Sequence, residues 1–115
     1  MRYLLLLHVD ESGWGRLTPA EQSAGMAAYG AFNEALAKAG ALVTTGRLAA
    51  SGVASTVRTK GGKAVVMDGP YAETKEQVGG FYLIEAADRG AALQWAASCP
   101  AVGHGVVEVR EVMGG

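Results

Sequence analysis

The stretch that decides the fold is RYLLLLHV, residues Arg2 to Val9, an almost unbroken run of large apolar side chains. Because neighbouring side chains of a strand point to opposite faces, this run predicts a strand that is buried on both faces of its sheet. FYLIE, residues Phe81 to Glu85, is a second run of the same kind. In Val106 to Val112 apolar and polar side chains alternate, which predicts a final strand with one apolar face.

Two helices are predicted between these strands. Thr18 and Glu21 have the spacing of a capping box, Pro19 fits the first helical position, and Gly40 is a typical stop. A second helix is expected between Asp88 and Pro100, with the aspartate as its cap.

The remaining segments complete the order of elements. Ala41 to Thr45 reads as a short strand, and Thr56 to Thr59 and Lys63 to Met67 flank Gly61-Gly62, a pair favoured in tight hairpin turns. The order predicts one α+β domain over residues 1–115, a ferredoxin-like βαββαβ sandwich with an extra β-hairpin. The order does not determine where the hairpin lies relative to the sheet.

In this fold both helices cover the same face of the sheet, whereas two of its strands are apolar on both faces. An uncovered apolar sheet face is rare in a monomer. We therefore expect a homodimer in which two such faces pack together, forming a dimeric α/β barrel.

Composition excludes several classes of protein. The chain has 115 residues, with 10 basic and 11 acidic side chains and a net charge of −1. Such a balance lacks the excess of positive charge with which proteins bind nucleic acid or an anionic membrane. One cysteine excludes an intramolecular disulfide. The first apolar run is too short to span a membrane and lacks a cleavage site for secretion. We expect a cytoplasmic protein.

The polar segment DGPYAETKE, Asp68 to Glu76, is the most unusual part of the sequence. A carboxylate such as Asp68 at the end of a strand is well placed for acid–base chemistry in a cleft, or it accepts backbone hydrogen bonds in the Gly-Pro turn. Glu73 and Lys75 are either positioning groups, together with Tyr71, or an ordinary solvated ion pair.

His8 near the end of the first strand is the second candidate. If His8 faces a cleft, it is a natural acid or base, and Asp10, two residues later and so on the same face of the strand, could orient it. Otherwise it is a strand-end histidine that is hydrogen-bonded to the backbone. His104 lies in a glycine-rich turn. A metal site formed by these three residues is not predicted, because their spacing matches no known ligand pattern.

The segment DGPYAETKE, followed by Gly79-Gly80-Phe81-Tyr82, closely resembles the signature of the YCII-related, DGPF-type domain family, with Tyr71 in place of phenylalanine. RYLLLLHVDES at the start and VEVREV at the end fit the same family. The resemblance implies a ferredoxin-like protomer in a dimeric α/β barrel. Distant relatives look like cofactor-free enzymes with a His–Asp pair, including a dehydrochlorinase of chlorinated hydroxyquinols. Association of DGPF-type proteins with extracytoplasmic-function sigma factors implies a regulatory context.

Two functions are therefore predicted as alternatives. The first is an enzyme that needs no cofactor and acts on a small molecule, with catalytic candidates His8 and Asp68 and ligand-binding candidates Asp10, Tyr71, Glu73 and Lys75. The second is a non-catalytic dimeric module that binds a small ligand or a protein such as a sigma factor. Fold alone does not distinguish them.

Overall fold

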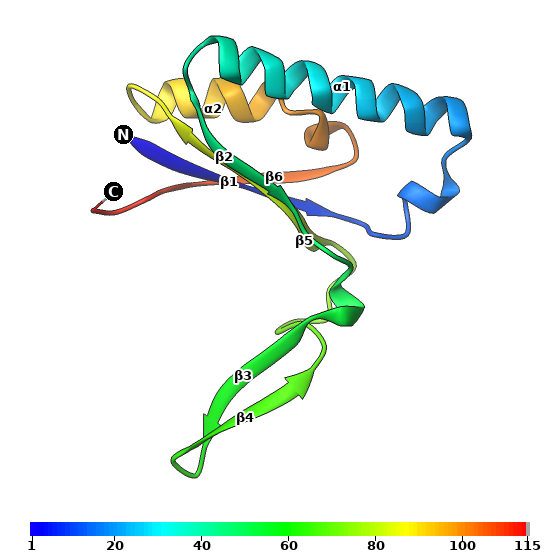
Figure 1. Cartoon of the computed structure of the whole chain (residues 1–115), viewed down its shortest axis with the longest axis vertical. Helices are drawn as coiled ribbons and strands as arrows, with labels where there is room; N and C mark the ends of the chain where they lie inside the picture. Colours follow the sequence, from blue (N-terminus) through cyan, green and yellow to red (C-terminus); the bar gives the residue numbers. More distant parts are fainter. Residues whose placement is uncertain (115) are drawn as a thin grey trace.

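The computed structural model describes residues 1–114. In chain order the elements are β1 (Arg2–Val9), η1 (Trp14–Arg16), α1 (Pro19–Lys38), β2 (Leu42–Arg47), η2 (Ser51–Val53), β3 (Ser55–Lys60), β4 (Lys63–Asp68), β5 (Gln77–Glu85), α2 (Arg89–Ser98), η3 (Pro100–Gly103) and β6 (Gly105–Glu111). Figure 1 shows α1 and α2 on one face of a sheet and the β3–β4 hairpin extending away on the other side.

The main sheet has four antiparallel strands in the order β2-β5-β1-β6. This order, with one helix after β1 and one after β5, is the ferredoxin-like arrangement predicted from the sequence. The two strands with apolar side chains on both faces, β1 and β5, are the central ones. β5 begins at Gln77, earlier than predicted, so Gly79 and Gly80 lie inside the strand.

The predicted caps of both helices are present. The Thr18 hydroxyl accepts a hydrogen bond from the Glu21 backbone N–H at 3.2 Å, and the Glu21 carboxylate accepts one from the Thr18 N–H at 2.8 Å. Asp88 accepts from the Ala91 N–H at 2.9 Å. These bonds satisfy donors that the first helical turn would otherwise leave free, and so they fix where each helix begins.

The core lies between the helices and one face of the sheet. Leu5 and Ile84 of the central strands and Leu36 of α1 are fully buried, each with an exposure of 0%. The Phe32 ring meets the Tyr82 ring edge-on, with the centroids 5.1 Å apart. Burial of a Leu or Ile side chain stabilises a fold by about 2 kcal/mol, so this single layer accounts for much of the protein's stability.

Other polar and sulfur-containing groups on this side are structural. The Tyr82 hydroxyl donates to the Asn33 side-chain oxygen, joining β5 to α1. Cys99 is 1% exposed, and burial raises the pKa of its thiol. A buried thiol in this state is a small apolar core residue rather than a nucleophile.

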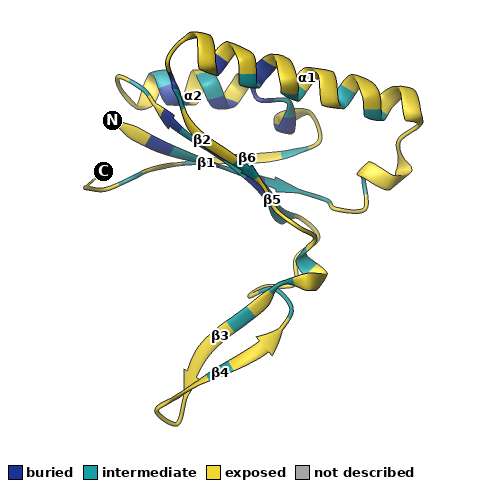
Figure 2. Ribbon diagram, viewed as in Figure 1, coloured by how far each residue is buried: buried dark blue, intermediate teal, exposed yellow. Residues whose placement is uncertain are grey.

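The hairpin of β3 and β4 forms a sheet of its own. Gly61 and Gly62 have φ values of 59° and 82°, which permit the tight turn that the glycine pair predicts. At the base of the hairpin the Gly69 N–H donates to the Ala54 carbonyl at 2.7 Å, which extends the pairing of its two strands by one more bond. In Figure 2 nearly the whole hairpin is exposed, in contrast to the dark blue segments between sheet and helices.

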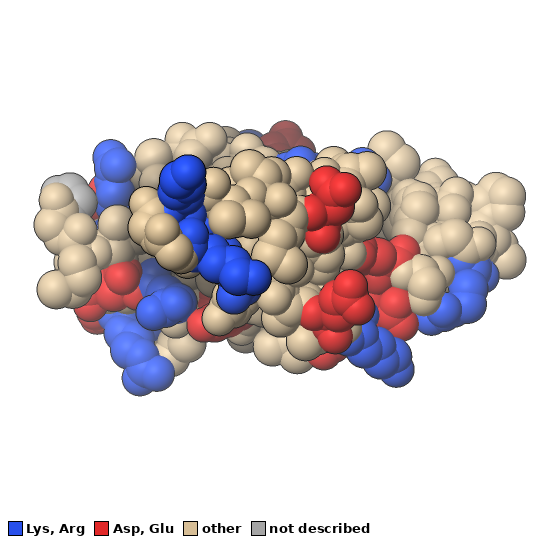
Figure 3. All heavy atoms as spheres, turned by 90° about the horizontal axis from the view of Figure 1, so that it is seen from below, with Lys and Arg blue, Asp and Glu red and all other residues tan. Residues whose placement is uncertain are grey.

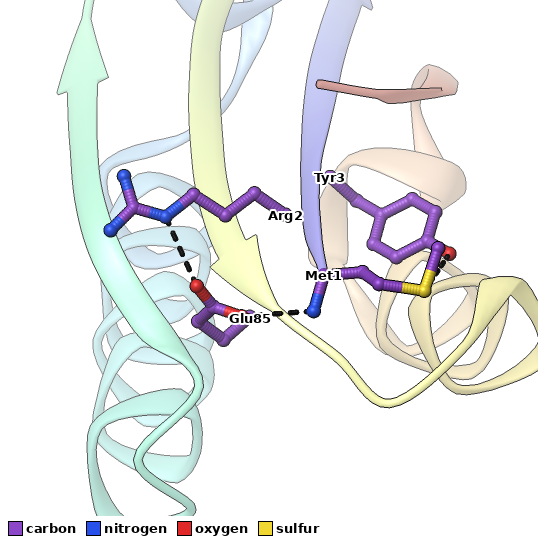
Figure 4. A network of polar contacts seen from close by, with 4 residues as sticks. All are labelled: Met1, Arg2, Tyr3 and Glu85. Atoms are coloured by element: carbon purple, nitrogen blue, oxygen red, sulfur yellow. Dashed lines mark hydrogen bonds and ion pairs between the residues drawn. The ribbon is translucent and has the colours of Figure 1, made fainter. Parts of the chain in front are cut away.

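Polar contacts join β1 to the end of β5. The Met1 ammonium group lies 3.2 Å from one Glu85 carboxylate oxygen, and Arg2 Nε donates to the other at 3.0 Å (Figure 4). These groups are half exposed, so the pairing contributes little stability but ties the strand ends together. No helix within residues 1–114 combines the length and apolarity needed to cross a membrane.

Candidate functional site

A cleft of about 890 Å³ lies where the end of β1 and the start of β5 meet the base of the hairpin. The residues lining it are His8, Leu48, Ala49, Ser51, Ala54, Ser55, Thr56, Val57, Pro70, Tyr71, Ala72, Thr74, Glu76, Gln77 and Val78. Its volume suits a small organic molecule, and a mostly apolar wall with a few polar groups is typical of such sites.

His8 and Glu108 form the main polar pair at this cleft. The His8 Nε2 atom lies 2.9 Å from a Glu108 carboxylate oxygen, and the side chains are 30% and 46% exposed. The antiparallel register explains the contact, because His8 pairs with Val106 and Glu108 is the next residue on the same face of β6. His8 lines the cleft, whereas Glu108 is not among the lining residues and contacts the imidazole from the neighbouring strand.

An irregularity in the strand pairing precedes His8. The register of β1 against β5 shifts between Leu7 and His8, opposite Gly80 and Val78. A glycine pair inside a strand is typical of a bulge or a close backbone approach, and the register shift at Gly79 and Gly80 is such a bulge. The extra residue is Gly79 of β5, whereas the pairing of β1 with β6 continues through His8 without a shift.

The predicted loop after β4 is held by hydrogen bonds. Thr56 Oγ1 donates to the Gly69 carbonyl at 2.8 Å, and Gly69 has φ 103°, a left-handed conformation that favours glycine. The Gln77 amide donates to the carbonyls of Ala72 and Thr74 at 2.9 and 3.0 Å. The conformation of this wall of the cleft is thereby fixed, with the Tyr71 side chain 84% exposed at its rim.

Asp10, predicted to orient His8, has other partners. Its carboxylate accepts from the Ser12 N–H at 3.0 Å and from the Ser12 hydroxyl at 2.7 Å, and it lies 3.6 Å from Arg16. The hydrogen bonds from Ser12 lower the pKa of Asp10. The pairing of His8 with Asp10 was therefore wrong, because Asp10 stabilises the turn after β1 and Glu108 takes the place beside His8.

The other predicted site residues are divided by the fold. Tyr71 lines the cleft with His8, whereas Asp68, Glu73 and Lys75 are not among its lining residues. Asp68 ends β4 and is exposed. Its predicted partnership with His8 is replaced in the structure by the contact between His8 and Glu108.

His104 lies apart from His8. Its Nε2 atom is 3.1 Å from the Tyr29 hydroxyl of α1. Burial raises the pKa of Tyr29 to about 12, so that the phenol stays protonated and can donate to the imidazole. His104 thus packs against the helix layer. The cluster of His8, Asp10 and His104 that was considered from the sequence does not form.

Sequence reasoning missed Glu108 and Gln77. Glu108 was visible only as a polar position in the alternating pattern of the last strand, and the pattern does not say which neighbour it meets. Gln77 fell between the predicted polar segment, which ends at Glu76, and the strand predicted from Phe81. Within residues 1–114, no three His, Cys, Asp or Glu side chains are placed together to hold a metal ion.

These features define a ferredoxin-like α+β fold with a cleft at one end of its sheet. The chain belongs to the YCII-related domain family, whose model matches residues 1–114. An uncharacterised protein of Rhizobium meliloti (strain 1021) is 40% identical over 96 residues, which are 84% of this chain and 77% of that protein.

A solved structure shares the fold. It is 5-chloro-2-hydroxyhydroquinone dehydrochlorinase (TftG) from Burkholderia phenoliruptrix AC1100, in complex with 2,5-dihydroxybenzoquinone. The match has a TM-score of 0.58 and 16% sequence identity and covers 100% of this chain and 96% of TftG. At this identity the likeness establishes the fold and leaves the activity to the residues of the cleft.

Proposed function

We propose that this protein is an enzyme that acts on a small organic molecule bound in the cleft, with His8 as the group that transfers a proton. The observation that carries the proposal is the 2.9 Å contact between His8 Nε2 and the Glu108 carboxylate at the wall of that cleft. An imidazole oriented by a carboxylate is a recurring arrangement for acid–base catalysis.

In this proposal the two residues have different tasks. When the Nε2–H of His8 donates to Glu108, the lone pair of Nδ1 is free to accept a proton from a bound molecule. The carboxylate then faces the positive charge of the imidazolium and stabilises it. His8 is thus the catalytic residue, and Glu108, which stands outside the cleft lining, is a positioning residue.

The fold neighbour suggests which molecules to test first. TftG is a dehydrochlorinase solved with 2,5-dihydroxybenzoquinone. Removal of hydrogen chloride from a hydroxylated ring needs a base for the proton, which His8 supplies in this proposal, and it needs no redox cofactor. Hydroxylated six-membered rings that carry chlorine are therefore the proposed substrate class, and rings without chlorine are analogues for the binding measurement.

The test is to measure binding of such rings by calorimetry and their turnover by absorbance, for the wild type and for His8→Gln. We expect kcat to fall by about 10²–10⁴ when the acid–base group is removed, with Kd changed only a few-fold. His104→Gln, which changes the histidine that lies against α1, is the matched control and should retain activity. Full activity of His8→Gln would refute the proposal.

Glu108→Gln tests the positioning role separately. The amide keeps the size of the side chain but cannot stabilise the imidazolium, so kcat should fall while KM stays close to the wild-type value. The pH profile of kcat/KM should also move, which a purely structural role would not cause. Binding without turnover in the wild type would instead support the alternative function, a non-catalytic ligand-binding module.

A further inference from the structure

The charged side chains at the cleft are few and acidic. Glu76 lines the cleft, whereas no lysine or arginine of residues 1–114 does so. Two more carboxylates contact lining residues from outside the cleft. Glu108 lies 2.9 Å from the His8 imidazole, and Glu11 accepts hydrogen bonds from the backbone N–H and the hydroxyl of Ser51. A ligand in this cleft therefore meets carboxylates that no lining lysine or arginine offsets.

The Glu76 carboxylate has no protein partner within residues 1–114. The ion pairs in that part of the chain involve the carboxylates of Asp10, Glu85 and Glu108, and no hydrogen bond there ends on the Glu76 side chain. Its backbone carbonyl, in contrast, accepts a hydrogen bond from the Thr74 hydroxyl. A carboxylate with free acceptor sites at a mostly apolar cleft is suited to a cation that the ligand brings.

Tyr71 supplies an aromatic ring in the same loop between β4 and β5. It lines the cleft and is 84% exposed, so its ring is accessible to a ligand. The Gln77 amide fixes the loop by donating to the carbonyls of Ala72 and Thr74. Cations are attracted to the face of an aromatic ring within about 6 Å of its centre. An accessible ring and a free carboxylate on one fixed loop are two groups that recognise an organic ammonium ion.

The surface charge near the cleft has the same sign. In Figure 3, seen from below, red carboxylates gather right of centre, with blue side chains at their margin. Figure 1 places the base of the hairpin and the loop after β1 on that side. The strip of blue Lys and Arg side chains in Figure 3 lies left of centre, on the side of the hairpin's tip. A negative surface around a cleft raises the local concentration of cationic ligands.

We propose that Glu76 and Tyr71 form a site for a protonated amine on the ligand, here called the ammonium site. The Glu76 carboxylate accepts hydrogen bonds from the ammonium group, and the Tyr71 ring faces the same positive charge. A ring that carries a carboxylate would instead be repelled by Glu76. The inference rests on the proposed function in taking this cleft as the ligand site, and it narrows the ligand to a hydroxylated ring with an ammonium side chain. It does not need the proton transfer by His8.

The first experiment compares three phenols of nearly equal size by calorimetry with the full chain at neutral pH. Tyramine carries an ammonium group, tyrosol an uncharged hydroxyl and para-hydroxyphenylacetate a carboxylate. Tyramine should bind at least about fivefold more tightly than tyrosol, and para-hydroxyphenylacetate should bind most weakly. At about 1 M salt the preference for tyramine should shrink, because charges at an open cleft are then screened. Equal affinities for tyramine and tyrosol, tightest binding of the carboxylate, or no binding of any of the three would each overturn the inference.

The second experiment removes the charge of the proposed site. Glu76→Gln should weaken tyramine binding by about fivefold and change tyrosol binding by less than about twofold, because only tyramine uses the charge. Glu73→Gln is the matched control: it makes the same change in the same loop, but Glu73 does not line the cleft. Its tyramine affinity should stay close to that of the wild type. Equal losses in the two variants would show a general effect of charge and would overturn the assignment of Glu76.

The aromatic ring and His8 are tested in the same assay. Tyr71→Phe keeps a ring face and should retain the preference for tyramine, whereas Tyr71→Leu should lose part of it. Equal preferences in these two variants would remove Tyr71 from the site. His8→Gln should retain the preference while losing turnover of the chlorinated rings, so that failure of the ammonium site and failure of the proposed catalysis are observed separately. Loss of the preference in His8→Gln would overturn the assignment to Glu76 and Tyr71.

Discussion

Gly105→Ala provides a sharp test of the packing beside the candidate site. Gly105 begins β6 and pairs with Val9. A Cβ atom built on it would lie 2.2 Å from the His8 carbonyl oxygen and 3.2 Å from a Val9 methyl carbon. The carbonyl belongs to the backbone, so the side chain cannot avoid it by changing rotamer. β6 must move away from β1 at the point where the strands hold His8 and Glu108.

The cost follows from that distance. To reach about 3.0 Å, the least separation found for real Cβ atoms, the strands must separate by about 0.8 Å in a closely packed region. Overpacking of this kind costs about 1–3 kcal/mol. With a urea m-value of about 2 kcal/mol/M, the unfolding midpoint should fall by about 1 M at fixed protein concentration. The His8–Glu108 contact should loosen at the same time.

Gly103→Ala is the matched control, two residues earlier in the chain. A Cβ atom there meets no heavy atom within 4 Å, so the substitution should change the stability by less than about 0.5 kcal/mol. Equal midpoints for the two variants, at equal m-values, would refute the reasoning, since both lose a glycine and differ only in what the new methyl group meets.

Two further substitutions test the core and the base of the hairpin. Leu36→Ala should lower the free energy of unfolding by about 2–5 kcal/mol, because the Leu36 side chain is fully buried. Met26→Ala, on the exposed side of the same helix, should change it little. Similar urea midpoints for the two variants would contradict this prediction. The Glu11 carboxylate accepts the Ser51 N–H at 2.6 Å, and hydrogen bonds from Ser51 lower its pKa below the ordinary 4.5. Its stabilisation should therefore be complete above that pH and be lost as the pH falls through the lowered pKa. The difference in midpoint between wild type and Glu11→Gln should shrink from pH 6 to pH 3, and a constant difference would be evidence against the role of this bond.

The elements of the fold were predictable because their signals are local. A capping box specifies the start of α1 through bonds between residues three apart, and a glycine pair specifies the hairpin turn through φ alone. The continuous apolar runs identified β1 and β5 as strands with two faces to cover. Such signals need no knowledge of distant parts of the chain.

The partner of His8 was not predictable in this way. Asp10, Asp68 and Glu108 are all carboxylates that could lie near His8. Which of them does so depends on the register of β6 against β1, because His8 and Glu108 are 100 residues apart in the chain. A shift of one residue in that register would turn Glu108 to the opposite face. Asp10 was excluded by a neighbour, since Ser12 holds its carboxylate in a turn.

The sequence by itself determined the kinds of elements, their order, the ferredoxin-like class and the presence of an apolar sheet face without a helix to cover it. Hydrophobic periodicity, caps and turn residues act over a few positions, and so they can be read without coordinates. Only the tertiary structure decided that the hairpin forms its own sheet on the uncovered side and that the cleft at its base brings Tyr71 to the same walls as His8. Those outcomes depend on long-range pairing, where strand register and side-chain packing select one arrangement among several that the same local signals allow.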